Sequence, residues 1–238
     1  MSGILYIVAT PIGNLEDITL RAIRVLKEAD TIACEDTRQS KILFDHYGIT
    51  ARMVSLFEHN ELRRIPEILQ LLMSGKSVAV VSDAGTPTIS DPAFKLVRAV
   101  REAGLPVSAV PGPSAALAAI SVSGLPTDRF VFEGFLPHKK GRQTRWKTFA
   151  EEDRTIVLYE SPFRVMKTLS EAREYLGERP MVVAREITKK FEETVSGTPS
   201  ELIAHFEKHA PRGEFVILIA GKKYAEKALM SEEENEEN

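Results

Sequence analysis

The chain has 238 residues, a formal net charge of −3, 43% hydrophobic residues and 27% charged residues. This composition excludes a disordered or fibrous protein, and the length fits one large domain or two smaller ones. A single cysteine, Cys34, excludes a disulfide framework and a cysteine-rich metal site and indicates a reducing compartment. The first apolar run, residues 3–9, is too short for a membrane span and lacks the flanks of a signal peptide, so we expect a cytoplasmic protein without a membrane contact.

Short β-branched runs alternate with amphipathic segments in the first half, which is typical of an α/β protein. The expected strands are residues 4–8, 31–34, 78–82 and 107–110. The expected helices are residues 18–29, 61–73, 92–103 and 114–123. In the first of these helices Ala22, Ile23 and Leu26 form one apolar stripe at helical spacing, while Arg24 and Lys27 lie away from it.

The chain changes character between residues 110 and 126. Pro111, Gly112 and Pro113 form a stiff turn, a helix of small residues follows, and the break at residues 124–126 again contains Gly and Pro. We therefore expect an N-terminal α/β domain over residues 1–122, a C-terminal α/β domain over residues 123–224 and an acidic disordered tail over residues 225–238.

The second half repeats the α/β pattern. The expected strands are residues 130–133, 155–160, 181–187 and 214–220, and the expected helices are residues 162–175 and 199–206. Ser161 and Thr198 each precede a proline and predict helix starts, and Glu201 completes a capping box with Thr198.

The negative net charge comes from the end of the chain. Five glutamates lie in the last eight positions, so the remainder carries a formal net charge of +2. The net charge therefore does not exclude a nucleic-acid partner.

Three loops after expected strands are unusual, and ligands of open α/β sheets bind at the carboxyl ends of strands. The first, residues 9–14, has a single glycine, which disfavours a dinucleotide-binding turn; a phosphate-binding P-loop sequence is also absent from the chain. The second, residues 82–92, carries Asp83 and Asp91, which would only cap turns in the simplest interpretation. The third, residues 111–116, opens a helix whose N-terminus either faces a ligand or packs closely.

Seven segments of the sequence together closely resemble one branch of the tetrapyrrole methylase superfamily, the small-subunit ribosomal RNA cytidine-2′-O-methyltransferases. The matching segments are residues 5–19, 35–38, 82–92, 111–114, 134–137, 159–162 and 184–186, within a resemblance that runs from about residue 3 to residue 221. The resemblance implies a tetrapyrrole methylase-like fold of two α/β domains with S-adenosyl-L-methionine in the cleft between them. It also implies a homodimer and a decoding-centre cytidine of 16S ribosomal RNA, free or in the small ribosomal subunit, as acceptor.

The resemblance also assigns the methyl-donor contacts. Those of the first half are Pro11, Ser82, Asp83, Ala84, Gly85, Ile89, Ser114 and Ala115. In the second half, Glu160 and Gly197 would enclose the adenosine part. The chain lacks the glycine-rich first loop of the porphyrin-precursor methylases, which fits a different acceptor.

Methyl transfer from a sulfonium needs no enzyme nucleophile, metal or second cofactor, but a ribose hydroxyl must lose its proton to a general base. Glu35 and Asp36 are the catalytic candidates because they follow a strand and lie outside any apolar stripe. The alternative is that these carboxylates form ion pairs with Arg38 or Arg185 that only steady the loops. We expect no metal site: His205 and His209 are four apart but lack a third ligand, and they fit a helix C-terminus. Cys34 should be a buried thiol.

RNA contacts are expected from Lys139, Lys140 and Arg142 in the densest basic stretch, and from Arg38. The alternative for the basic stretch is a solvated helix start, with Trp146 in the core, and for Trp146 we favour the core. Two other functions stay open at this point: methylation of a porphyrin-type small molecule, and a catalytically idle RNA-binding or assembly factor.

Overall fold

The computed structural model describes residues 2–227, and the chain divides into two compact units between Ser114 and Ala115. The division falls before helix α5 (Ala115–Val122), not after it as expected from the sequence. The reason is packing: Ala119 and Ile120 of this helix share a hydrophobic cluster with strands of the second unit. The small-residue helix thus belongs to the second unit.

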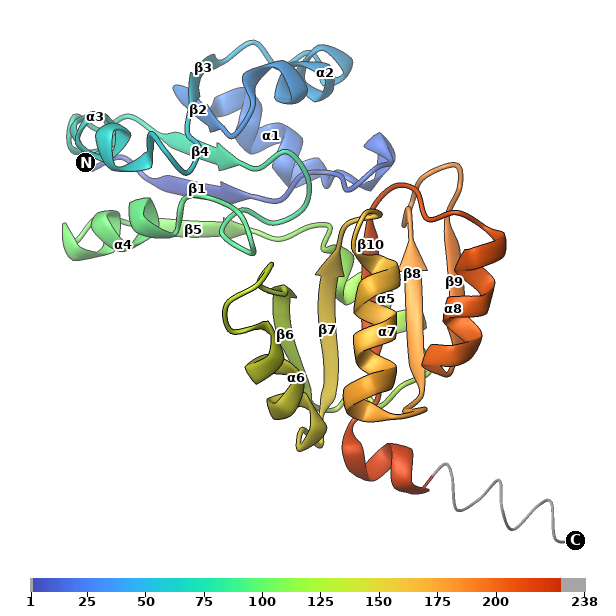
Figure 1. The fold of residues 1–238 in the computed structure, drawn as a ribbon. Coiled ribbons are helices and arrows are strands. Elements are labelled where there is room, and N and C mark those ends of the chain that lie inside the picture. The colour runs from blue at the N-terminus through green and yellow to red at the C-terminus, as the bar shows by residue number, and fades with distance from the viewer. Residues whose placement is uncertain (1, 228–238) are drawn as a thin grey trace, which may run out of the picture. The chain divides into compact units, whose positions relative to one another are not determined.

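The first unit is a five-stranded sheet in the order β3-β2-β4-β1-β5, in which every pairing is parallel (Figure 1). Its strands are β1 (Leu5–Val8), β2 (Thr31–Cys34), β3 (Arg52–Ser55), β4 (Val78–Val81) and β5 (Val107–Val110). Its helices are the short 3-10 helix η1 (Leu15–Asp17), α1 (Leu20–Glu28), α2 (Thr37–Tyr47), α3 (Glu61–Met73) and α4 (Phe94–Glu102). The strands and helices expected in this unit are confirmed, with ends that differ by at most two residues, whereas α2 and β3 were not expected.

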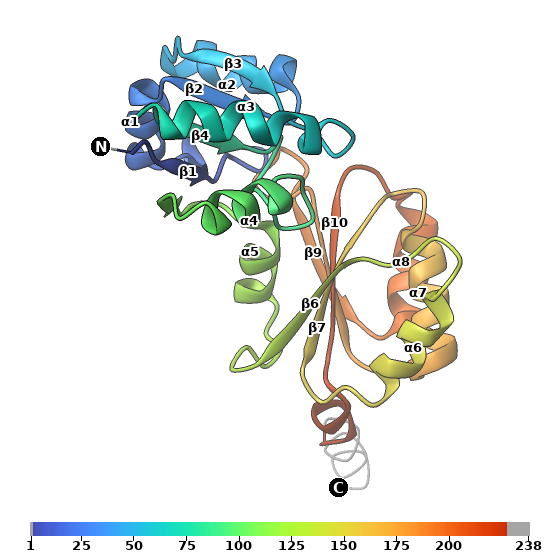
Figure 2. The ribbon, with the colours of Figure 1, turned by 90° about the vertical axis from the view of Figure 1, so that its left-hand side faces the viewer.

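The continuous apolar runs of the central strands have a simple cause, since helices cover both faces of this sheet (Figure 2). Ile32 and Cys34 of β2 pack in one cluster with residues of α1 and α2. Ala33, between them, points to the opposite face and packs in a cluster with residues of α3 and α4. The central strands β1, β2 and β4 therefore carry almost no polar residues, and their polar neighbours lie in the loops that follow them.

The order in which the chain connects the strands determines where those loops lie. The chain leaves β2 toward β3 at one edge of the sheet and leaves β4 toward β5 at the other, although β2 and β4 are neighbours. Such a reversal is the point at which open α/β sheets bind ligands. The segments that follow β1, β2, β4 and β5 all emerge at the same end of this sheet because all five strands are parallel.

The second unit is a mixed sheet in the order β6-β7-β10-β8-β9. Its strands are β6 (Phe130–Phe135), β7 (Thr155–Glu160), β8 (Met181–Arg185), β9 (Glu193–Gly197) and β10 (Phe215–Ile219). Helices α6 (Arg142–Ala150), α7 (Val165–Leu176) and α8 (Pro199–Lys208) cover one face and α5 covers the other (Figure 1). The expected strands are confirmed within two residues, and β9 was not expected.

The two predicted helix starts of this unit have different outcomes. Thr198 caps α8, and the capping box with Glu201 is complete, with Thr198 N donating to Glu201 Oε2 at 2.8 Å. The start at Ser161 is wrong, because residues 161–164 form a turn and α7 begins only at Val165. The carbonyl of Ser161 closes this turn by accepting from the backbone N–H of Arg164 and of Val165.

The end of the second unit also differs from expectation. Residues 222–227 are helical, and Ala225 is buried, so the expected disordered tail does not include residues 225–227. Residues 228–238 of that expected tail lie outside the described residues. Within residues 2–227, every helix is too short or too polar to cross a membrane.

Candidate functional site

Three loops of the first unit are fastened to one another by backbone hydrogen bonds. Thr10 N donates to Gly85 O at 2.8 Å, and Gly85 N donates to Thr10 O at 3.1 Å. The hydroxyl of Thr10 donates to Ser82 O at 3.2 Å, and that of Thr86 donates to Pro113 O at 3.2 Å. The structure therefore brings together the loops that hold Pro11, the segment from Ser82 to Gly85, Ile89 and Ser114, as expected from the sequence.

The loop between β4 and α4 has an unusual backbone. Gly85 has a φ of 80°, and the non-glycine residues Thr88, Ser90 and Ala93 also lie in the left-handed region, at 76°, 64° and 89°. Each non-glycine residue in the left-handed region costs on the order of 1–3 kcal/mol of folding free energy. Such a residue persists only where its surroundings fix its backbone, most often at ligand sites. A Cβ at Gly85 would lie 3.4 Å from Ile12 Cγ2, which is ordinary van der Waals contact, so the positive φ and not lack of space favours glycine there.

Carboxylates from two of the strand ends meet at this edge. Asp36 N donates to Asp83 Oδ1 at 3.0 Å, and Asp83 N donates to Glu35 Oε2 at 3.4 Å. Burial, more than any other cause, raises the pKa of Glu35 and of Asp83. Burial and the neighbouring charge of Glu35 raise the pKa of Asp91 to about 6. These three carboxylates thus form an acidic cluster, defined here as Glu35, Asp83 and Asp91.

Asp36 differs from the acidic cluster. Its side chain caps α2 by accepting from Arg38 N at 2.8 Å and pairs with Arg38 Nη2 at 2.6 Å. The Arg38 side chain, more than any other cause, lowers the pKa of Asp36 to about 2, which makes it a weak base. Of the two catalytic candidates, the geometry therefore favours Glu35. Arg38 is exposed, but its guanidinium is already paired with Asp36.

Asp91 is a candidate that sequence reasoning left as a turn cap. The loop in which it lies also contains Asp83, two residues after the buried strand β4 ends at Val81. Two acids in one strand-end loop were the available signal. These two acids lie close to Glu35 because β2 and β4 are neighbours in the sheet, and this pairing could not be predicted from the sequence.

The predicted adenosine contacts of the second unit, Glu160 and Gly197, lie at opposite ends of its sheet. Glu160 is level with Phe215 and Arg185 at one end of the sheet, and Gly197 is level with Met181 at the other. Four residue steps of about 3.3 Å separate these ends, roughly 13 Å along the strands alone.

Glu160 is also occupied within its own unit. Its side chain is 1% exposed; it accepts from Thr168 Oγ1 at 2.6 Å and from Ser161 N at 2.9 Å, and it pairs with Arg164 at 3.2 Å. These contacts give Glu160 a structural role. Ala115, the remaining predicted donor contact, is the first residue of α5.

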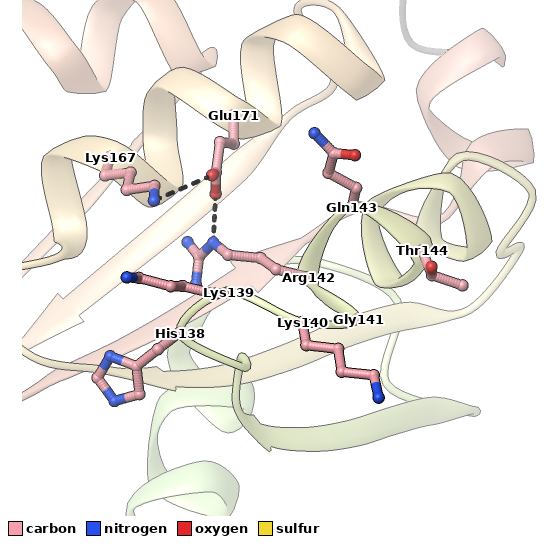
Figure 3. A pocket seen from close by; sticks show the side chains of 9 residues that line it. All are labelled: His138, Lys139, Lys140, Gly141, Arg142, Gln143, Thr144, Lys167 and Glu171. Carbon is pink, nitrogen blue, oxygen red and sulfur yellow. Dashed lines mark hydrogen bonds and ion pairs between the residues drawn. The ribbon is translucent and has the colours of Figure 1, made fainter.

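The basic stretch surrounds a cavity of about 380 Å³ in the second unit (Figure 3). Lys139 and Lys140 are exposed at this cavity, as an RNA contact requires. The expectation for Arg142 is corrected, since this residue is 3% exposed and its guanidinium donates to Glu171 at 2.6 Å and to Thr168 Oγ1 at 2.8 Å. Its charge is used to hold the unit together.

Three minor predictions are settled by burial and contacts. Trp146 is fully buried, with Nε1 donating to Glu171 Oε2 at 2.9 Å. Cys34 is buried, which raises the pKa of its thiol to about 11. His205 lies in the last turn of α8, and its Nε2 is 3.0 Å from Glu193 Oε1.

Comparison with known proteins gives the same family from sequence and from structure. Residues 4–203 match the model of the Tetrapyrrole (Corrin/Porphyrin) Methylases. Ribosomal RNA small subunit methyltransferase I of Thermotoga maritima is 49% identical over 221 residues, which cover 93% of this chain and 100% of that protein. The protein of the same name from Escherichia coli O157:H7 is 49% identical over 232 residues, which cover 95% of this chain and 81% of that protein.

Solved structures share the fold at low identity. The cobalt precorrin-4 methyltransferase CbiF has a TM-score of 0.68 and 20% identity, covering 91% of this chain and 94% of that one. Uroporphyrin-III C-methyl transferase from Thermus thermophilus, complexed with S-adenyl homocysteine, has a TM-score of 0.62 and 22% identity, covering 91% and 97%. These matches confirm the expected fold of two α/β units. The chain belongs to the tetrapyrrole (corrin/porphyrin) methylase family and, within it, to the group of ribosomal RNA small subunit methyltransferase I proteins.

Proposed function

We propose that this protein methylates the ribose 2′-hydroxyl of a decoding-centre cytidine in 16S ribosomal RNA, with S-adenosyl-L-methionine as donor. The observation that carries the proposal is the near-full-length identity of 45–49% to proteins named ribosomal RNA small subunit methyltransferase I. That the chain is a methyltransferase that uses S-adenosyl-L-methionine follows from its family. The ribose and the particular cytidine are the proposed part.

The acidic cluster fits the donor. At neutral pH the donor carries a sulfonium and an ammonium against one carboxylate, a net positive charge. The half-buried carboxylates of Glu35 and Asp91 and the exposed carboxylate of Asp83 provide the complementary sign. The linked loops of the first unit would hold the donor through Pro11, Ser82, Asp83, Ala84, Gly85, Ile89 and Ser114, and Ala115, the first residue of α5, would add a contact. When bound, the donor supplies a methyl carbon already activated for in-line displacement.

The residues of the chain then have two tasks. The first is alignment, because fixing the geometry of an in-line reaction supplies about 7–11 kcal/mol of the barrier. The second is acceptance of the hydroxyl proton as the new oxygen–carbon bond forms and the methyl carbon–sulfur bond breaks, with its electron pair left on sulfur; this acceptance is worth roughly 10²–10⁴-fold. Glu35 suits the second task because its raised pKa makes it a better proton acceptor than Asp36, and Asp91 is the alternative base in the same cluster.

A second edge of the molecule suits single-stranded RNA. The ends of β6, β7 and β8 lie at one end of the second sheet, and exposed aromatic rings stand at or after each of them. Phe135 is 54% exposed, Phe163 95% and Phe191 65%, and Lys190 Nζ lies 5.5 Å from the ring centre of Phe191. Rings and cations on one edge are the combination that stacks unpaired bases. This edge also carries Lys139 and Lys140.

A homodimer in the cytoplasm completes the proposal. Leu117 and Val122 of α5 are 56% and 64% exposed, although they belong to an almost wholly apolar helix. A second copy that covers such residues would remove apolar area from water. Light scattering during size exclusion tests this: a monomer mass at micromolar concentration would contradict the dimer.

The deciding experiment maps ribose methylation on small-subunit RNA. We expect the purified protein to transfer labelled methyl from S-adenosyl-L-methionine to small subunits that lack the modification, and mass mapping to locate it on a 2′-oxygen of a cytidine. Naked 16S RNA and a uroporphyrinogen are run in parallel. Transfer to the porphyrin alone would establish the small-molecule methylase, and RNA binding without transfer would establish the idle factor.

A further inference from the structure

The cavity at the basic stretch combines two separate segments of the chain. His138, Lys139 and Lys140 come from the loop before α6, while Lys167 and Glu171 come from α7 (Figure 3). The volume of about 380 Å³ is many times the roughly 30 Å³ that one water occupies, so a phosphate with part of its sugar has room. Lys167 was not expected from the sequence, since it is 28 positions from Lys139.

The cavity carries positive charge that neighbouring carboxylates do not fully compensate. Its one lining carboxylate, Glu171, accepts from Arg142 at 2.6 Å and from Trp146 at 2.9 Å, and lies 3.8 Å from Lys167. Within the described residues, neither Lys139 nor Lys140 forms an ion pair. Two lysines are thus left with their full charge beside a carboxylate that is already neutralised.

A buried network fixes the shape of the basic loop. Arg142 donates to Pro137 O at 3.3 Å, and Arg164 donates to Leu136 O at 2.5 Å. Both guanidiniums lie against Glu160, Arg164 at 3.2 Å and Arg142 at 4.0 Å. The carbonyls that precede Lys139 are therefore held from inside the unit, so the loop loses little conformational entropy when it binds.

We propose that this cavity holds a phosphate of the RNA backbone, contacted by Lys139, Lys140 and Lys167. The inference rests on the proposed function and deepens it, because it assigns the contact to phosphate and not to a base. The lining supplies cations and hydrogen-bond donors, while the exposed aromatic rings lie outside it. Such a contact positions the RNA without reading its sequence.

The test compares salt dependence of RNA binding. The variant carries Lys139→Gln and Lys167→Gln, and its matched control carries Lys27→Gln and Lys208→Gln, two exposed lysines on other helices. Dissociation constants for a small-subunit RNA fragment are measured from 50 to 400 mM KCl, with circular dichroism to verify folding. We expect the variant to bind about tenfold more weakly at low salt and its log–log slope to fall by about 0.7–0.9, while the control keeps the wild-type slope.

The other outcomes overturn one claim or the other. If the variant binds RNA with the wild-type slope and affinity, the phosphate site is overturned. The proposed function still stands in that case if the wild-type protein methylates small-subunit RNA. Wild-type protein that neither binds nor methylates small-subunit RNA overturns the proposed function itself. Pyrophosphate is the second probe: thermal stabilisation of the wild type but not of the variant, together with an unchanged RNA slope, would assign the cavity to a free small anion and overturn the RNA contact.

Discussion

Single residues of this protein acquire their roles from neighbours that are distant in the sequence. Glu35, Asp36 and Asp83 are all acids after strands, yet Asp36 is neutralised by Arg38 while burial raises the pKa of the other two. Glu160 and Arg142 stand in motifs that the sequence marks as functional, and both are buried in a common network. A sequence motif can mark a residue as important. Whether that residue contacts a ligand or stabilises the fold depends on whether its side chain is buried.

Asp91 should make donor binding depend on pH. Its pKa of about 6 lies above the ordinary 3.8. Between about pH 4 and pH 6 the folded state therefore binds more protons at Asp91 than the unfolded state does. The contribution of Asp91 to the stability of the donor-free protein consequently falls as pH rises through this range. The cationic donor prefers the deprotonated form. We expect calorimetry to show affinity rising about tenfold from pH 5 to pH 7.5. Asp91→Asn should flatten this profile, and an unchanged profile would remove Asp91 from the site.

Glu35→Gln should separate catalysis from binding. The glutamine carbonyl still accepts from Asp83 N, so the loop geometry is kept while the base is lost. We expect turnover to fall by about 10²–10⁴-fold, with the donor dissociation constant changed by no more than a few-fold. Asp36→Asn is the comparison and should retain far more activity. If Asp36→Asn were the more damaging change, Asp36 would be the base.

At the scale of elements, the sequence predicts best what is buried on two faces. β2 and α3 have the predicted ends because one is a continuous apolar run and the other has a regular stripe with clear limits. The edge strands β3 and β9 were not expected, since their residues are only partly buried and alternate with polar ones. Strand pairing, and with it the acidic cluster, depends on long-range contacts that local patterns do not encode.

The cap of α8 gives a stability prediction. Thr198→Ala removes the hydroxyl that accepts from Glu201 N and half of the capping box. We expect the free energy of unfolding to fall by about 1 kcal/mol, within the 0.5–2 kcal/mol usual for such caps, in urea denaturation. Ser170→Ala, an exposed serine inside α7, is the control and should stay within about 0.5 kcal/mol. Equal effects would show that the box contributes nothing specific.

Arg142, the buried arginine of α6, gives a second prediction about stability. Arg142→Met removes a guanidinium and leaves Glu171 and Thr168 with fewer donors inside the second unit. We expect a loss of about 3–5 kcal/mol of stability, seen as a lower urea midpoint, because one partner of a buried pair is left unpaired. A fully stable Arg142→Met protein would show that these buried contacts contribute no net stability.

At the scale of the whole molecule, charge is distributed unevenly along the chain. The formal net charge is −3, yet five glutamates fall within residues 231–238. A chain ended at residue 230 would carry +2, and long-range attraction to RNA grows with positive charge. We expect this shortened protein to associate with RNA about two- to fivefold faster at 50 mM KCl in stopped flow, with no difference near 400 mM because salt screens the effect. A difference that persists at high salt would mean that the tail acts by direct contact.

The pairing of Thr10 with Gly85 also has a consequence for mutational tolerance. Both of its hydrogen bonds join main-chain atoms, so they survive a change of side chain at Thr10, whereas the φ of 80° at Gly85 suits glycine and few other residues. Saturation mutagenesis should therefore accept almost no residue but glycine at position 85, whereas the buried position 10, whose hydroxyl also donates to Ser82 O, should accept only small side chains. The closure of the loops thus depends on the main-chain geometry that glycine permits at position 85.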